Sequence, residues 1–396
     1  MKKQTKYIAL AVIVILSIFI ISTRSEASEY EVISGNKVNE SKGELAHTLL
    51  EYYNKTETQQ VSYKLDSLLH RINKSHDFNG SLLVAKNGKI VYNNQIGYAD
   101  FNKKVPLNEV FTFQLASVSK QFTATAIMLL YERDQIRLND YVNTYFPDFP
   151  FENVTIKNLL NHTAGLPKYF WVTDHKWKNE KAPTNSEMMT FLESINVQRH
   201  FAPGSRFDYS NTGYFVLASI VEKVSGMSFG DFMKENIFDP LEMKDSFVYS
   251  FENDSIKSNQ LEGYRLYKGW RHLKINSTLN DAIVGDKNVY STCEDLFKWT
   301  LGLNNGKILS KESLDLMYTE GETIKGRKIP YGFGFRIDPK DKNIIYHHGK
   351  WNGFSTGLTQ YLEDDLVIIV LEHTSYQGIT TLTRKVKKIV QENLSV

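Results

Sequence analysis

Strand patterns occur near both ends of this chain, and helical patterns fill the region between them. "GSLLVAKNGKIVYNNQIGYAD" places Asn87-Gly88 between two apolar runs, which predicts a β-hairpin. Four strand patterns follow late in the chain: "YGFGFRI", "NIIYHHG", "FSTGLTQYL" and "LVIIVLEH". An early hairpin and a late meander predict one antiparallel sheet, with the helical region inserted within it.

Helical spacing flanks these strands. It begins at Val61 and continues through Leu65 and Ile72, and the chain closes with an amphipathic pattern that includes Ile379 and Val386. We therefore expect an α+β fold in which terminal helices cover the sheet. The expected domain spans residues 59–396, has a mostly helical insertion at about 139–310, and follows a polar linker at 28–58.

The N-terminus carries a basic segment, "MKKQTK", and then a continuous apolar run over residues 7–22. This pattern is typical of a signal peptide, and Ser25 and Ala27 offer small residues for cleavage. The alternative is an uncleaved membrane anchor, because the run nearly reaches the length that spans a bilayer. Both interpretations of residues 1–27 predict an exported protein, periplasmic or extracellular.

Composition excludes several classes of function. The 47 basic and 45 acidic residues are nearly balanced, so the sequence indicates no nucleic-acid partner. Cys293 is the single cysteine, which excludes an internal disulfide and a cysteine-built metal site. We expect neither a metal nor another cofactor.

Ser117 and Lys120 lie at the start of a second apolar run, in "FQLASVSKQFTATAIMLLYE". The run predicts a largely buried helix, which would place both side chains on one face near its N-terminus. A nucleophilic serine and an ordinary N-cap both suit that position. The spacing alone is weak, because it recurs at Ser34 and Lys37 in the linker.

Two further short motifs follow at a distance. Tyr-x-Asn occurs four times, but only the copy at Tyr209 and Asn211 lies in a Pro-Gly-led loop that opens an apolar helix, "FAPGSRFDYSNTGYFVLASIVEKVSG". His-x-Gly occurs once, at His347 and Gly349, where a predicted strand ends. His347 and His348 are adjacent on that strand, so their side chains should point to opposite faces.

Together and in this order, the three motifs resemble those of the penicillin-recognising serine hydrolases. This family includes class C β-lactamases, D-alanyl-D-alanine peptidases, D-aminopeptidases and certain esterases. "LLNHTAGLP", "VYSTCEDLFKW" and "YGFGF" are also similar to family stretches, and the resemblance covers roughly residues 60–392.

The resemblance implies a role for each motif residue. Ser117 would be the nucleophile, and Lys120 or Tyr209 would accept its proton; the choice between these two bases stays open. Asn211 would orient the substrate amide and Lys120, and His347 would line the opposite wall. Backbone N–H groups of Ser117 and of Lys350, next to Gly349, would form the oxyanion hole. His162 is expected to be structural.

One departure from the family pattern bears on the substrate. The β-lactamases usually carry Lys-Thr-Gly where this chain has His347-His348-Gly349, and histidine is only partly charged near neutral pH. The expectation is therefore an exported serine hydrolase that acts through an acyl-enzyme on D-amino-acid peptides or related amides and esters. Peptidoglycan is the substrate that the compartment suggests. A class C-like β-lactamase, a penicillin-binding sensor and a non-catalytic envelope protein are the alternatives.

Overall fold

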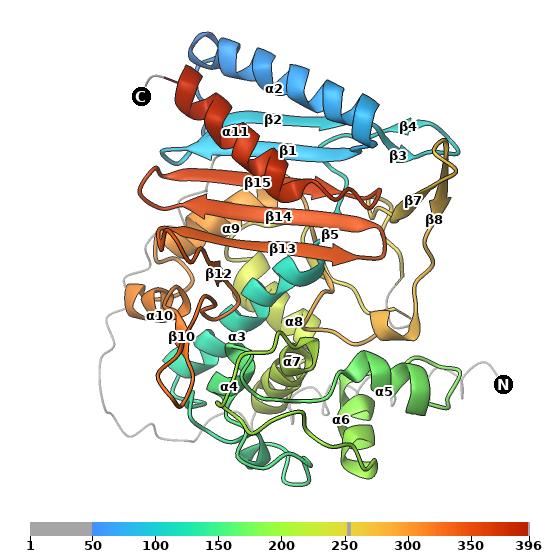
Figure 1. Cartoon of the computed structure of the whole chain (residues 1–396), viewed down its shortest axis with the longest axis vertical. Helices are drawn as coiled ribbons and strands as arrows, with labels where there is room; N and C mark the ends of the chain where they lie inside the picture. Colours follow the sequence, from blue (N-terminus) through green and yellow to red (C-terminus); the bar gives the residue numbers. More distant parts are fainter. Residues whose placement is uncertain (1–49, 252–254, 395–396) are drawn as a thin grey trace, which may run out of the picture. The chain divides into compact units, whose positions relative to one another are not determined.

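A six-stranded antiparallel sheet runs in the order β12-β13-β14-β15-β1-β2 (Figure 1). This arrangement comes from a computed structural model, which describes residues 50–251 and 255–394. The strands are β1 (Gly80–Lys86), β2 (Lys89–Ile96), β12 (Arg336–Ile337), β13 (Ile344–Trp351), β14 (Phe354–Tyr361) and β15 (Leu366–Glu372). Strand β1 of the early hairpin pairs with β15 of the late meander, so the predicted single sheet is confirmed.

The hairpin turns where the sequence predicted it. Asn87 and Gly88 have φ values of 49° and 72°. Two successive positive φ angles are typical of the tight turn that Asn-Gly favours between antiparallel strands. The first late pattern, "YGFGFRI", forms a strand only over its last two residues, Arg336 and Ile337.

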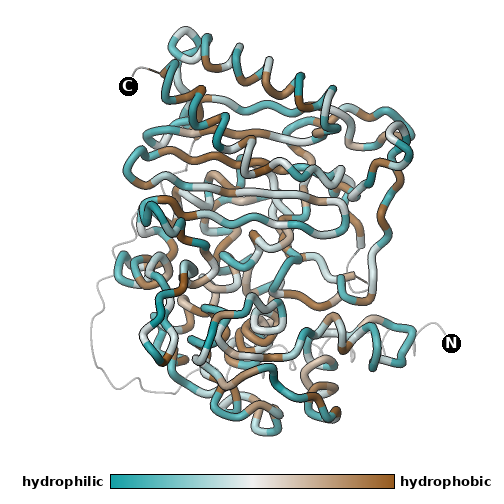
Figure 2. Tube along the Cα trace, viewed as in Figure 1, coloured by the Kyte–Doolittle hydropathy of each residue, from teal (hydrophilic) through white to brown (hydrophobic). Residues whose placement is uncertain are grey.

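Two terminal helices cover one face of the sheet, α2 (Lys55–His76) and α11 (Ile379–Asn393). Buried side chains of α2 and α11, such as Val61 and Val386, form one apolar cluster with Leu82 and Val84 of β1. Figure 2 shows hydrophobic and hydrophilic residues alternating along both helices. Helix α2 starts at Lys55, inside the range predicted to be a linker, because the side chain of Asn54 caps its N-terminus.

A second layer packs on the opposite face, where Leu83 and Ala85 of β1 point. It contains α9 (Cys293–Asn304) and α10 (Lys311–Met317), and α9 contacts β1 and β15. The short helix η1 (Ala116–Val118) contacts β13 and β14. This layer therefore joins the sheet to the helical region.

The helical region occupies the lower half of Figure 1. Its helices are α3 (Ser119–Glu132), α4 (Ile156–Leu160), α5 (Tyr169–Lys176), α6 (Asn185–Ser194), α7 (Asn211–Ser225) and α8 (Phe229–Met233). Helix α7 contacts α3, α4, α6 and α8, so it is central to this region.

Short strands and turns complete the described part of the chain. The strands are β3 (Tyr98–Asp100), β4 (Val105–Pro106), β5 (Phe113–Gln114), β6 (Phe247–Val248), β7 (Tyr264–Tyr267), β8 (Arg271–Lys274), β9 (Val289–Ser291), β10 (Gly321–Glu322) and β11 (Lys328–Ile329). The helical turns are η2 (Val142–Thr144), η3 (Lys234–Phe238) and η4 (Leu279–Asp281).

The membrane-anchor prediction concerns residues 1–27, which lie outside the described residues, so it stays a prediction. Within residues 50–251 and 255–394, no helix has the length and apolar character needed to cross a membrane.

Candidate active site

Ser117 lies in η1, immediately before α3, and its side chain is partly exposed. The segment packs directly against β13 at Gly349. A Cβ atom at Gly349 would lie 2.2 Å from the carbonyl oxygen of Leu115 and 2.9 Å from Cβ of Ala116. Only glycine permits this approach without a shift of the backbone. The glycine of His-x-Gly therefore brings the third motif beside the first.

Lys120 is fully buried one turn after Ser117. Its Nζ lies 3.1 Å from Oγ of Ser117, 2.8 Å from Oδ1 of Asn211 and 2.8 Å from the backbone oxygen of Asp286. Asn211 is the first residue of α7, so the first two motifs meet at this lysine. The structure thus brings together three of the residues that the sequence selected.

The contacts of Lys120 define how it can act as a base. A carbonyl oxygen can only accept, so Asn211 and Asp286 each hold one N–H group of Lys120. In the neutral amine, the lone pair can then point toward Ser117 and accept its proton. Burial lowers the pKa of Lys120 to about 7, and Arg336 lowers it further while Asp286 opposes the shift. A neutral fraction of Lys120 is therefore present near neutral pH.

Tyr209 lies above the same lysine, with Nζ of Lys120 5.1 Å from the centroid of its ring. Its hydroxyl oxygen is buried without a hydrogen-bond partner among the described residues. Burial raises the pKa of Tyr209, while the nearby Ser117 hydroxyl and Arg336 lower it. The net direction is upward, so the phenol is neutral near neutral pH and can donate or relay a proton.

His347 is fully buried on β13, while His348 is only partly buried on the opposite face, as predicted. Nδ1 of His347 donates to the carbonyl of His348 at 2.8 Å, because that oxygen can only accept. Nε2 therefore accepts from the Tyr331 hydroxyl at 3.1 Å. Burial and Arg336 hold the pKa of His347 well below its usual value, so the ring is neutral. Its role toward a substrate stays a prediction.

Lys350 follows Gly349 on β13, and its exposed side chain donates to Gln377. Its proposed role concerns the backbone N–H group alone. The contact between β13 and η1 brings this part of the strand close to the segment that carries Ser117, but the oxyanion hole stays a prediction.

The ring of His162 packs against the ring of Tyr209. Their ring centroids are 4.3 Å apart, and Nδ1 of His162 accepts a hydrogen bond from the backbone N–H of Ser210 at 3.1 Å. Burial and Lys120 hold the pKa of His162 well below its usual value. A neutral histidine in this position fits the structural role expected for it.

Sequence reasoning missed Arg336. Its guanidinium carbon lies 5.1 Å from the centroid of Tyr209 and 5.9 Å from that of Tyr331. Within the described part of the chain, Arg336 makes no ion pair. The only signal was its position directly after "YGFGF", a stretch noted for its glycines and aromatics. The structure therefore supplies a cation that His347 does not.

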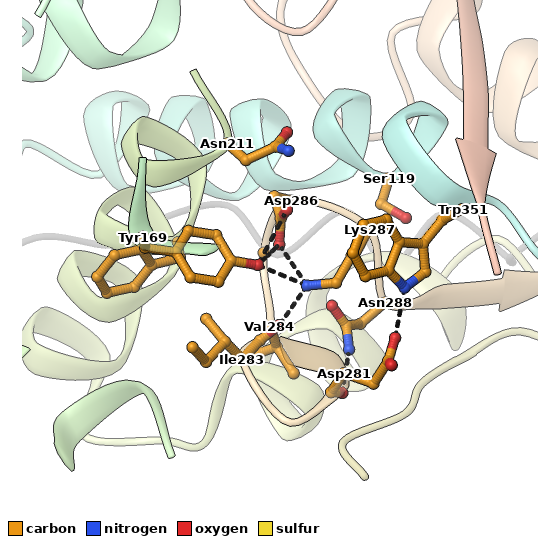
Figure 3. Close-up of polar contacts among 12 residues, drawn as sticks. Ser119, Tyr169, Asn211, Asp281, Ile283, Val284, Asp286, Lys287, Asn288 and Trp351 are labelled. Carbon is orange, nitrogen blue, oxygen red and sulfur yellow. Dashed lines mark hydrogen bonds and ion pairs between the residues drawn. The ribbon is translucent and has the colours of Figure 1, made fainter. Parts of the chain in front are cut away.

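A buried ion pair between Asp286 and Lys287, also missed by sequence reasoning, is drawn in Figure 3. Lys287 is 2% exposed and Asp286 0% exposed, and Nζ of Lys287 lies 3.2 Å from Oδ1 of Asp286. Figure 3 shows Lys287 reaching toward Asp286 and the Tyr169 hydroxyl. Adjacent residues of opposite charge occur often on surfaces, so the sequence carried no signal that this pair is buried.

Comparison with known proteins places this geometry in a family. The beta-lactamase family model matches residues 65–389. Penicillin-binding protein 4* of Bacillus subtilis is 34% identical over 333 residues, which cover 79% of this chain and 73% of the relative. A putative penicillin-binding protein of the same organism, PbpX, is 28% identical over 319 residues, 80% of this chain and 76% of the relative.

Solved structures share the fold. The penicillin-binding protein of Bacillus halodurans superposes with a TM-score of 0.71 at 25% identity, covering 81% of this chain and 98% of the other. The D-amino acid amidase of Ochrobactrum anthropi gives a TM-score of 0.68 at 22% identity, covering 86% and 100%, which shows the fold alone. The chain therefore belongs to the beta-lactamase family of serine hydrolases.

Proposed function

We propose that this chain is an exported serine hydrolase that forms an acyl-enzyme on Ser117. The observation that carries the proposal is the 3.1 Å separation of Ser117 Oγ and Lys120 Nζ, with the pKa of Lys120 lowered to about 7. An unassisted serine hydroxyl is a poor nucleophile, and a neutral amine within hydrogen-bond reach can take its proton.

In the proposed reaction, Ser117, Lys120 and Tyr209 carry out all the proton transfers. Ser117 Oγ attacks the carbonyl carbon while its proton passes to Lys120. Backbone N–H groups of Ser117 and Lys350 stabilise the oxyanion. When the C–N or C–O bond breaks, the leaving group receives a proton from Lys120, relayed by the Tyr209 hydroxyl. Water then hydrolyses the Ser117 ester by the reverse sequence of proton transfers.

The proposed substrates are D-amino-acid peptides or related amides and esters, with peptidoglycan stem peptides as the natural example. Two observations support this choice. Related proteins are named penicillin-binding proteins, and one neighbour of the same fold is a D-amino acid amidase. In addition, Arg336 offers a cation near Tyr209, where it can attract the carboxylate that ends such a peptide.

Two other functions use the same site. One is a penicillin-binding protein whose Ser117 is acylated by a β-lactam and releases the acyl group slowly, and the other is a β-lactamase that releases it fast. The names of the relatives favour β-lactam binding as such. Both candidates need the same activated Ser117 and differ only in the fate of the acyl group, so a rate of deacylation separates them.

Hydrolysis assays test the substrate class. The purified chain, without residues 1–27, would receive an acyl-D-alanyl-D-alanine peptide, its L,L counterpart, a D-alanyl ester and a penicillin. We expect release of D-alanine from the D,D-peptide or the ester, little release from the L,L-peptide, and none by Ser117→Ala. Turnover of penicillin alone would replace the peptidase proposal with the β-lactamase one. Turnover of none of the four compounds would reject both enzymes, and a lasting penicillin adduct on Ser117 would then favour the slowly deacylating penicillin-binding protein.

A further inference from the structure

The segment Gly285–Val289 runs along the first turns of α3 and is bound to three of its side chains. Thr123 donates to the carbonyl of Gly285 at 2.5 Å, Lys120 donates to that of Asp286 at 2.8 Å, and Ser119 accepts from the N–H of Val289 at 3.1 Å. The position of the Asp286 carbonyl on Lys120 is therefore built into the fold. Its side chain is necessarily close as well.

That side chain is a carboxylate with no access to water. Asp286 accepts a hydrogen bond from the Tyr169 hydroxyl, at 3.1 Å from Oδ1 and 3.2 Å from Oδ2, and pairs with Lys287. A bare carboxylate beside Lys120 would stabilise the ammonium form of that lysine, and it does raise the pKa of Lys120. A charged Lys120 cannot accept the proton of Ser117.

Lys287 is held where its positive charge can offset the negative charge of Asp286. Its Nζ lies 2.6 Å from the Tyr169 hydroxyl, 3.2 Å from Asp286 and 3.3 Å from the carbonyl of Ile283, so each N–H group has an acceptor. The ammonium also lies 5.3 Å from the ring centroids of Tyr169, Phe170 and Trp351. Burial lowers the pKa of Lys287, whereas the charges of Asp286 and Asp281 and these aromatic faces favour its ammonium form. Phe170 and Trp351 stack on each other, with centroids 4.9 Å apart, which encloses it.

We propose that Lys287 is a positioning residue: its ammonium neutralises the Asp286 carboxylate, so that Asp286 can hold Lys120 through its backbone carbonyl without keeping Lys120 charged. The inference rests on the proposed function for its catalytic consequence, since a base matters only if Ser117 is acylated. A merely structural ion pair would affect stability and leave the protonation of Lys120 unchanged.

Several other groups bear on the charge of Lys120 and stay constant in the test. They come from every element around it, namely Arg336 on β12, His347 on β13, His162 after α4, Tyr209 before α7 and Tyr214 on α7. Because none of these residues is altered, a change in the protonation of Lys120 reports on Asp286 and Lys287.

The test measures the protonation of Lys120 directly and the rate of acylation separately. Lysine labelled at its ε-carbon would be titrated by NMR, with the Lys120 signal assigned from its loss in Lys120→Met. Phosphonylation of Ser117 by a fluorophosphonate, in which Oγ attacks phosphorus and displaces fluoride, would be followed over the same pH range as the measure of Ser117 activation. We expect Lys287→Met to move both midpoints upward by about one pH unit or more, because the carboxylate is no longer balanced.

Two further variants and a control complete the design. Asp286→Asn removes the carboxylate and should move both midpoints downward. This variant still tests the inference if Lys287→Met does not fold, because Lys287, left without its partner, can lose its proton and stay buried as a neutral amine. The double variant should return to the wild-type position or slightly below. Lys298→Met removes another largely buried lysine, paired with Asp295 at 2.8 Å, and should leave both midpoints unchanged.

The outcomes separate the two hypotheses. If the Lys120 titration is the same in the wild type, in Lys287→Met and in Asp286→Asn, the inference is overturned whatever the acylation rate. If the titration moves as expected but no variant and no wild-type protein is acylated, the assignment of Lys287 stands and the proposed function fails.

Discussion

Nζ of Lys120 lies 3.1 Å from Oγ of Ser117, and the same lysine is held by Asn211 and by the backbone of Asp286. Two N–H groups of Lys120 are therefore fixed by these acceptors, and the remaining position on Nζ points toward the Ser117 hydroxyl. This geometry places the amine of Lys120 in a buried site beside Ser117, where burial favours its neutral form.

The first prediction concerns pH. Because the pKa of Lys120 is about 7, the rate of Ser117 acylation should rise with pH through that value and then level off. Below it, Lys120 is protonated and cannot act as a base. Lys120→Met should lower the rate by about a hundredfold or more at the plateau. The measurement is the fluorophosphonate reaction rate against pH; a rate that is flat across neutral pH would argue against Lys120 as the base.

Tyr209→Phe tests the relay of the proton to the leaving group. The hydroxyl has no partner within the described residues, so its loss should change stability little. We expect hydrolysis of an amide to fall by about a hundredfold or more, and reaction with a fluorophosphonate, whose fluoride leaves without a proton, to fall much less. An equal loss for both would assign Tyr209 to the activation of Ser117 instead.

Arg336 is predicted to recognise a carboxylate. Arg336→Gln should raise KM about tenfold or more for a substrate with a free C-terminal carboxylate, and hardly change it for the corresponding C-terminal amide. Arg336→Lys should raise this KM less, because lysine keeps the positive charge but lacks the planar guanidinium that can form two hydrogen bonds to a carboxylate. Arg133→Gln, which removes an exposed arginine bound to Asn236, is the control and should alter neither KM. Equal changes for acid and amide would reject this role.

Gly349→Ala tests the close approach of β13 to η1. The added Cβ would meet the Leu115 carbonyl at 2.2 Å, so we expect a loss of about 1–3 kcal/mol of unfolding free energy and slower acylation. Gly230→Ala in α8 is the matched change, because its Cβ would meet atoms no nearer than 3.8 Å. It should be neutral or stabilising by about 0.5–1 kcal/mol. Thermal unfolding of the two variants compares them, and similar Tm values would contradict the packing argument.

Much of the fold could be predicted because its local signals agree with one another. The Asn87-Gly88 turn, the alternation along β13 and the apolar spacing of α2 and α11 each specify an element without reference to the rest. The start of α2 was misplaced because Asn54 lies in a polar stretch that resembles a linker. Caps of this kind are short signals that depend on one side chain.

The site was predictable only in part. Ser117, Lys120, Tyr209 and Asn211 belong to short motifs whose order along the chain is informative. Asp286 and Lys287 are buried charges, and no local pattern in the sequence reports burial of a charge. Arg336 is only partly buried and lies near Tyr209, a residue distant in sequence. The neutral state of His347 likewise depends on burial and on the nearby Arg336, so the sequence could only suggest a partly charged ring.

Intact-mass spectrometry of the purified chain without residues 1–27 tests the central claim most directly. The protein would be incubated with a fluorophosphonate and, separately, with a penicillin, beside Ser117→Ala and Ser119→Ala. Ser119 is the matched control because it lies in the same motif and is buried against Val289. We predict one adduct on the wild type and on Ser119→Ala, and none on Ser117→Ala. An unmodified wild type, or an adduct that persists in Ser117→Ala, would contradict the account.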